Sequence, residues 1–359
     1  MGHRRIAFLA LTLATALAFA APVANAQAPA APTYYLKTTI AMPVWANLEN
    51  ISTDISWVDP ASHTMVIGDR TGNAVEVIDT NSYTFVRAAG QGNFAGRLAT
   101  ADGGPNGVAQ VSPVEAVGAD GNSSLKLVNM FSGDVQSIST GGTHRADELA
   151  YDPSTDTVMV ANDREDEGKN FVTLIKIHPL QILGKIDYSN APGGLEQPVV
   201  APGGRFYFAV PATTENPGGE IDVINQASRS IERRIPVGDC RPTGLVQGID
   251  GRVVTASGCV VDIQSGNVVA RIAGAGGDEA GSVPTIGVYA WIVPDPDSEG
   301  SFRLNLGDAN TNQVYQSLPA FGAHNLAGNW VTGEIFTPDL VNKRILVFAP
   351  TVPVGGKGK

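Results

Sequence analysis

Cysteine is scarce in this sequence: Cys240 and Cys259 are the only two among 359 residues. Two thiols are fewer than a structural metal site needs, so we do not expect this pair to hold a metal by itself. In an oxidising compartment the pair is expected to form a disulfide, and closing so short a loop would stabilise the fold by roughly 3 kcal/mol. Two free thiols are the alternative.

Positive charge is also in short supply. The chain has 24 Lys and Arg residues against 35 Asp and Glu residues, which gives a formal net charge of −11. Nucleic acids and anionic membrane surfaces are bound through clustered Lys and Arg side chains. We therefore expect no nucleic-acid partner. Separately, we expect the protein to be a monomer that binds a small molecule.

Several short catalytic motifs are missing. The sequence contains no P-loop, no dinucleotide fingerprint, no C-x-x-C-H haem attachment site, no G-x-S-x-G elbow and no H-E-x-x-H pair. Nucleotide cofactors, c-type haem and serine-hydrolase chemistry are therefore disfavoured.

Only one apolar run is long enough to attract attention, and it lies at the N-terminus. Arg4 and Arg5 precede residues 6–21, and Ala24-Asn25-Ala26 follows with the small-x-small pattern of a signal-peptidase site. We predict a cleaved signal peptide over residues 1–26, no membrane span, and a periplasmic or secreted mature protein. A membrane anchor is the weaker alternative because the run is short. Residues 27–33 are rich in Ala and Pro and are expected to form a flexible leader.

Long amphipathic helical patterns are absent, whereas Gly and Pro are plentiful, with 41 and 23 residues. This composition predicts an all-β fold. The sequence also repeats with a period near 45 residues, each repeat offering short strands separated by polar turns. Seven units follow one another, over residues 54–90, 103–140, 144–188, 195–238, 241–274, 278–319 and 324–350.

The seventh unit has only three strands. A ring of four-stranded blades must close to protect its sheet edges, and the usual closure takes the missing strand from the other end of the chain. Residues 34–41 (YYLKTTIA) are a spare strand of the right length. We therefore predict one seven-bladed β-propeller over residues 34–350, followed by a disordered tail at 351–359. Two β-sandwiches are the competing architecture, but they explain neither the period nor the incomplete last unit.

Several motifs recur between units. The openings RPTGLVQ, GPNGVAQ and ADELAYDP are followed by VMVAND in one unit and by AVEVIDT or EIDVINQ in others. These motifs resemble the YVTN-type propeller repeats of exported bacterial proteins, although the signature tetrapeptide has become MVIG and MVAN here. The resemblance implies the fold. It says less about activity, because the family includes binding proteins, haem-related proteins and lactonase-like enzymes.

One position in each unit offers a candidate site. Aligning the units on their second strands gives one residue about ten positions earlier in every blade, at the mouth of the central channel: Asp54, Asn106, Asp147, Glu196, Thr243, Asp278 and His324. The next position adds Glu148, Gln197, Glu279 and Asn325, and the preceding ones add His144, Arg145 and Arg241. Because consecutive strand residues face opposite ways, we expect the first set to line the channel.

Carboxylates around a narrow mouth need a cation, water or a raised pKa. Oxygen ligands suit Ca²⁺, and a nearby histidine would also accept Zn²⁺, Mn²⁺ or Fe²⁺. We expect Asp54, Asp147, Glu196 and Asp278 to bind the metal and His324, Asp147 and Glu196 to be catalytic. The expected ligand-binding residues are Asn106, Thr243, Arg241, His144, Glu148 and Asn325.

The hypothesis is a metal-assisted hydrolase or lyase acting on a lactone or ester, by analogy with the metal-dependent lactonases built on six-bladed propellers. A water-filled polar channel without catalysis, in a binding or protein-interaction propeller, is the alternative. We expect Trp57, Trp291 and Trp330 to lie in the core and Trp45 to face the channel mouth.

Overall fold

The computed structural model describes residues 31–99, 102–298, 301–322 and 324–351. The predicted signal peptide, most of the predicted leader and residues 352–359 of the predicted tail lie outside these residues. Within the described residues no helix is long and apolar enough to cross a membrane.

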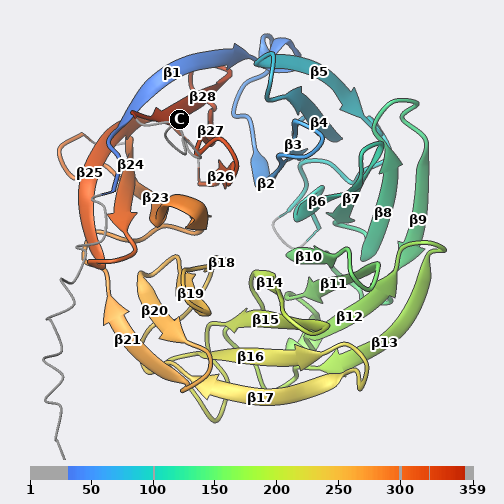
Figure 1. Cartoon of the computed structure of the whole chain (residues 1–359). Helices are drawn as coiled ribbons and strands as arrows, with labels where there is room; N and C mark the ends of the chain where they lie inside the picture. The colour runs from blue at the N-terminus through green and yellow to red at the C-terminus, as the bar shows by residue number, and fades with distance from the viewer. Residues whose placement is uncertain (1–30, 100–101, 299–300, 323, 352–359) are drawn as a thin grey trace, which may run out of the picture. The chain divides into compact units, whose positions relative to one another are not determined.

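The described chain forms seven four-stranded antiparallel sheets arranged in a ring (Figure 1). The predicted seven-bladed propeller is confirmed. The first blade contains β2 (Thr53–Asp59), β3 (Thr64–Asp69), β4 (Ala74–Asp79) and β5 (Thr84–Ala89), and the second contains β6 (Val108–Ser112), β7 (Glu115–Asp120), β8 (Ser124–Asn129) and β9 (Val135–Ser139). The third blade contains β10 (Leu149–Asp152), β11 (Thr157–Asn162), β12 (Phe171–Lys176) and β13 (Gln181–Asp187). The fourth contains β14 (Pro198–Ala201), β15 (Arg205–Val210), β16 (Glu220–Asn225) and β17 (Ser230–Pro236).

The remaining blades follow the same order. They are β18 (Leu245–Gln247), β19 (Arg252–Thr255), β20 (Cys259–Asp262) and β21 (Asn267–Arg271); β22 (Ala280–Val283), β23 (Val288–Pro294), β24 (Phe302–Asp308) and β25 (Gln313–Ala320); and β26 (Ala327–Gly328), β27 (Ile335–Asp339), β28 (Arg344–Pro350) and β1 (Tyr34–Ala41). Three short 3-10 turns, η1 (Pro43–Trp45), η2 (Asp166–Gly168) and η3 (Pro284–Ile286), complete the described elements.

The N-terminal strand closes the ring. β1 pairs antiparallel with β28, in a register that runs from Tyr34 opposite Pro350 to Ala41 opposite Arg344. It therefore forms the outer edge of the seventh blade, as the three-strand last unit predicted. In Figure 1 it lies at the rim together with β5, β9, β13, β17, β21 and β25.

The hydrophobic core lies largely between neighbouring blades. The middle strands β3 and β4 are almost entirely buried, because both of their faces are covered by adjacent sheets. One cluster joins Ile40, Phe336 and Val347 of the seventh blade to Met65 and Ile67 of the first. Stacking of this kind explains why the middle strands are continuous apolar runs, whereas the rim strand β5 alternates between exposed and half-buried residues.

Two further predictions concern the cysteines and the tryptophans. Cys240 and Cys259 lie at disulfide distance, with their Cα atoms 6.1 Å apart. The prediction that Trp57 and Trp330 lie in the core was wrong, because both line the central channel and are 38% and 40% exposed. Their rings meet edge to face, with centroids 6.4 Å apart. Trp45, expected at the channel mouth, is fully buried instead.

Candidate functional site

The centre of the ring encloses a channel of about 470 Å³, lined by the innermost strands of all seven blades. Neighbouring inner strands contact one another around the ring, from β2 through β6, β10, β14, β18 and β22 to β26 and back to β2. The wall is mostly apolar, as Ile55, Val108 and Leu149 illustrate. Trp57 and Trp330 also belong to it.

The residues predicted from the repeat lie directly before these lining segments. Their common position is visible in the backbone, because Asn106, Asp147 and Glu196 each donate their amide to the equivalent alanine of the second strand, at 2.9, 2.8 and 3.1 Å. The constant sequence spacing therefore reflects a repeated hydrogen bond. Because each residue lies at or just before the start of its inner strand, the set gathers at one end of the channel, which we call the channel head.

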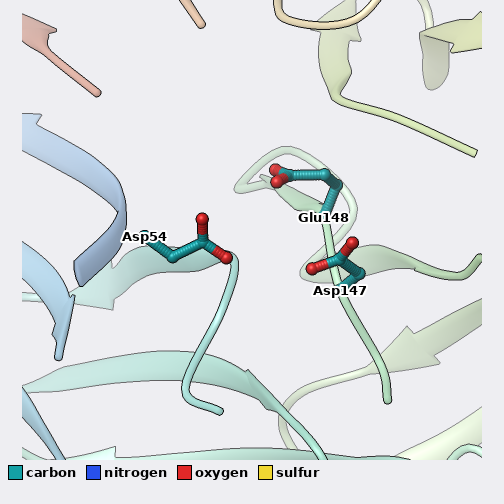
Figure 2. Close-up of side chains that lie close together, drawn as sticks. All are labelled: Asp54, Asp147 and Glu148. Atoms are coloured by element: carbon teal, nitrogen blue, oxygen red, sulfur yellow. The ribbon is translucent and has the colours of Figure 1, made fainter. Parts of the chain in front are cut away.

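Three carboxylates come together at the channel head. Ligand atoms of Asp54, Asp147 and Glu148 all lie within 4.8 Å of one another. Figure 2 shows Asp54 on one segment and Asp147 and Glu148 on another, with the carboxylates facing the space between them. All three residues are buried, and Asp147 Oδ1 and Glu148 Oε2 accept no hydrogen bond from the described residues. Such unpaired buried oxygens are costly unless a proton or a cation joins them.

Glu148 belongs to the set that was not expected to line the channel. The alternation argument assumed that these residues are part of a strand, but β10 begins only at Leu149. Before the strand, the chain is free to turn Asp147 and Glu148 toward the same group.

Arginines balance part of this charge. Arg70, at the end of β3, pairs with Asp54 and donates from Nε to Asn106 Oδ1 at 2.8 Å. Arg145 pairs with Asp147, and its Nε also lies 3.2 Å from Asp163 Oδ1. Each arginine therefore engages one carboxylate of the three-residue group, while Glu148 has no such partner among the described residues.

His324 reaches the group from the seventh blade. Its Nε2 lies 3.1 Å from Asp54 Oδ1, so Asp54 is held between a histidine and an arginine. Burial lowers the pKa of His324, but the Asp54 carboxylate outweighs this effect and raises the pKa above its ordinary value. For Asp54 burial has the opposite effect and raises the pKa, but the positive charges of Arg70 and then His324 outweigh it and bring the pKa of Asp54 below its ordinary value. Asp54 is therefore ionised and His324 tends to be protonated.

The pKa values of Asp147, Glu148 and Glu196 are raised, whereas that of Asp54 is lowered. Burial and the Asp163 carboxylate raise the pKa of Asp147 well above its ordinary value, and burial and Glu279 do the same for Glu148. Burial and Asp278 raise the pKa of Glu196 to about 8. These shifts have one cause: too many carboxylates share a small, poorly solvated space.

Glu279 is a candidate site residue that the sequence analysis did not include in the predicted site. It was noted only as the residue that follows Asp278. The structure buries it at 4% exposure, leaves its Oε2 without a hydrogen bond among the described residues, and raises its pKa through burial and the Asp278 carboxylate. Its equivalence to Glu148 in the repeat was the signal that could have identified it.

The remaining predicted residues are spread around the head and take structural partners. Thr243 Oγ1 donates to the Asp278 backbone oxygen at 2.9 Å, and the buried Asn325 accepts from Ser56 at 2.9 Å. His144 stands between Asp102 at 2.9 Å and Asp166 at 3.1 Å. Arg241 is exposed on a loop and Asp278 is exposed as well.

Comparison with known proteins adds no further constraint: no protein-family model and no curated protein matches this chain. The site is therefore interpreted from its own geometry.

Proposed function

We propose that the channel head binds a divalent cation through Asp54, Asp147 and Glu148, and that this cation takes part in the hydrolysis or lyase cleavage of a small molecule held in the channel. One observation carries the proposal: the buried oxygens Asp147 Oδ1 and Glu148 Oε2 have no partner among the described residues and belong to a three-carboxylate group whose ligand atoms lie within 4.8 Å. Of the residues predicted as metal ligands, Asp54 and Asp147 are retained, and Glu148 joins them.

Ca²⁺ fits this ligand set best. All the available ligand atoms are carboxylate oxygens, which hard cations prefer. The one nearby histidine, His324, uses its Nε2 to contact Asp54, so it does not favour Zn²⁺ or Fe²⁺. Bound there, a divalent cation would polarise a carbonyl oxygen of the substrate.

Proton transfer is assigned to Glu196 in preference to His324. A pKa of about 8 places the Glu196 carboxyl near neutrality, where it can give up and recover a proton. His324 contacts Asp54, whose carboxylate raises the pKa of the imidazole and keeps it protonated, so His324 is less available to accept a proton. His324 then acts as a positioning residue for Asp54, and Asp147 acts as a ligand.

The substrate class follows from the channel. Its wall is mostly apolar, with Gln197 and Ser282 among the few polar residues. A compact ester or lactone would place its carbonyl at the carboxylates and its carbon skeleton against the wall. The repeat motifs support an origin among YVTN-type propellers, and lactonase-like activity is known in that family.

The cysteine pair supports export. Paired cysteines persist in oxidising compartments, so the disulfide-distance pair agrees with the signal-like N-terminus. We infer a periplasmic or secreted protein.

The experiment is a hydrolysis assay on a panel of lactones and aryl esters, with added Ca²⁺ or with EDTA. The proposal expects turnover that needs Ca²⁺ and that falls at least about 100-fold in Glu196→Gln, the scale of general acid–base catalysis. Glu148→Gln is expected to lose both turnover and its Ca²⁺ dependence. Absence of turnover across the panel, or turnover that EDTA leaves unchanged, would favour a non-catalytic binding propeller instead.

A further inference from the structure

A separate pair of buried carboxylates, Asp69 and Glu76, lies in the first blade. Asp69 is the last residue of β3 and Glu76 is the third residue of β4, and both have 0% exposure. Neither oxygen of Glu76 accepts a hydrogen bond from the described residues. Burial raises the pKa of Glu76 well above its ordinary value, and Asp69 adds to this because its carboxylate repels the ionised form and accepts a hydrogen bond from the protonated form.

The second blade has a lysine, Lys126, at the position equivalent to Glu76. Glu76 lies opposite Ile67, the fourth residue of β3, and Lys126 lies opposite Gly118, the fourth residue of β7. Lys126 Nζ lies 2.6 Å from Asp120 Oδ2, and Asp120 is the equivalent of Asp69. In the second blade a lysine ammonium therefore neutralises the aspartate.

The first blade has a glutamate where the second has that lysine. Asp69 accepts hydrogen bonds from Trp45 Nε1 at 2.8 Å and from the amides of Thr71 and Gly72, but the described residues supply no ion pair to Asp69 or Glu76. The equivalent acid of the fourth blade, Asp222, receives the hydroxyl of Tyr188 and has Arg234 4.0 Å away. Among these equivalent positions only Glu76 is a buried acid without a donor.

Glu76 also lines a cavity of about 270 Å³. Val44, Leu48, Thr71, Asn73 and Gln91 contribute to the same wall. The cavity therefore offers the carboxylate together with side-chain hydroxyl and amide groups, and it has room for an ion with water molecules.

We propose that Asp69 and Glu76 form a second divalent-cation site, in which the ion takes the place of the ammonium that Lys126 supplies in the second blade. A divalent ion would displace the proton from Glu76, and its two positive charges would then neutralise both carboxylates, as one lysine neutralises one aspartate in the second blade. The oxygen-only ligands select Ca²⁺ over softer metals. The site uses none of the channel-head carboxylates and would stabilise the first blade, since anything that binds only the folded state raises its stability.

The test measures Ca²⁺ binding by equilibrium dialysis on the full chain carrying Glu148→Gln, which disables the proposed channel site. One Ca²⁺ per chain is expected, and Glu76→Gln added to this background should abolish it. Glu76→Lys should abolish it too while keeping the fold, because the new ammonium reproduces the Lys126–Asp120 pair. Asp222→Asn is the matched control and should leave one Ca²⁺ bound.

Trp45 provides a second readout, because its indole donates directly to Asp69. Tb³⁺ bound at the site should emit when tryptophan is excited, and this emission should disappear in Glu76→Gln. Binding that persists in Glu76→Gln, or no binding in the Glu148→Gln background, would overturn the proposal. Either result would leave the channel site to be judged by its own assay.

Discussion

His324 Nε2 lies 3.1 Å from Asp54 Oδ1, across the junction where the seventh blade meets the first. The contact joins residues that are 270 positions apart in the sequence. The inner strands β26 and β2 contact each other at this junction, so the candidate site includes residues from both ends of the propeller.

Replacing His324 by Gln should strengthen cation binding. The amide of Gln can still donate to Asp54, but it removes a positive charge that competes with the cation for the same carboxylate. The gain is expected to reach up to about tenfold in affinity, which is the scale of a partly screened unit charge. Calorimetric titration with Ca²⁺ measures it, and weaker binding in His324→Gln would show that the imidazole itself helps to hold the ion.

Arg145→Met should destabilise the fold strongly. Arg145 is buried and contacts both Asp147 and Asp163, so its loss leaves Asp147 without an ion-pair partner among the described residues and leaves Asp163 with the half-exposed Arg164 alone. Breaking a buried pair in this way costs about 3–5 kcal/mol. Urea unfolding measures the effect.

Arg164→Met is the control for this prediction. Arg164 also pairs with Asp163, at 3.2 Å, but its side chain is 50% exposed. An exposed pair contributes about 1 kcal/mol or less, so the control should unfold almost as the parent protein does. Equal losses in the two variants would contradict the assigned role of Arg145.

Asp222 should make stability depend on pH between about 4 and 7. Burial and Glu220 raise the pKa of Asp222 to about 7, above the 3.8 of an ordinary aspartate. In this window the folded state keeps a proton that the unfolded state has lost, so the free energy of unfolding falls as the pH rises.

Asp222→Asn removes this penalty and can still accept the hydroxyl of Tyr188. At pH 8 the variant should be more stable than the parent by about 4 kcal/mol, while at pH 4 the two should be nearly equal. Thermal unfolding across the pH range checks this, with Asp250→Asn as a control for an Asp-to-Asn change at an exposed position. A variant that is less stable than the parent at pH 8 would refute the argument.

The fold could be predicted from the sequence because its cues are local and repeated. Seven units with the same strand and turn order define seven blades, and the three-strand last unit requires the strand at Tyr34–Ala41. These inferences need no knowledge of any single side chain's direction.

The site could be predicted only in part. Spacing identified Asp54 and Asp147, since their place is fixed by the backbone of the repeat. The directions of Glu148 and Glu279 could not be inferred, because both residues precede their strands and are not bound by strand alternation. Trp57 was misplaced for a related reason: an aromatic residue of an inner strand can face either the blade core or the channel, and the apolar character of the channel is visible only once seven blades are assembled.

The central claim is that the channel head binds a divalent cation, and Glu148 tests it most directly. The measurement compares melting temperatures of the parent protein and Glu148→Gln, at pH 8, with EDTA and with Ca²⁺, together with elemental analysis of the purified parent. Both proteins in this comparison, the one that keeps Glu148 and the one with Glu148→Gln, also carry Glu76→Gln, so that the proposed first-blade site does not contribute.

The account predicts a bound metal and a melting temperature that rises with Ca²⁺ in the protein that keeps Glu148, because binding to the folded state stabilises it. The variant with Glu148→Gln should melt at the same temperature in Ca²⁺ and in EDTA. In EDTA it should melt above the protein that keeps Glu148, since it buries one carboxylate fewer beside Asp147 and Glu279. A protein that keeps Glu148 yet contains no metal and ignores Ca²⁺ would contradict the account.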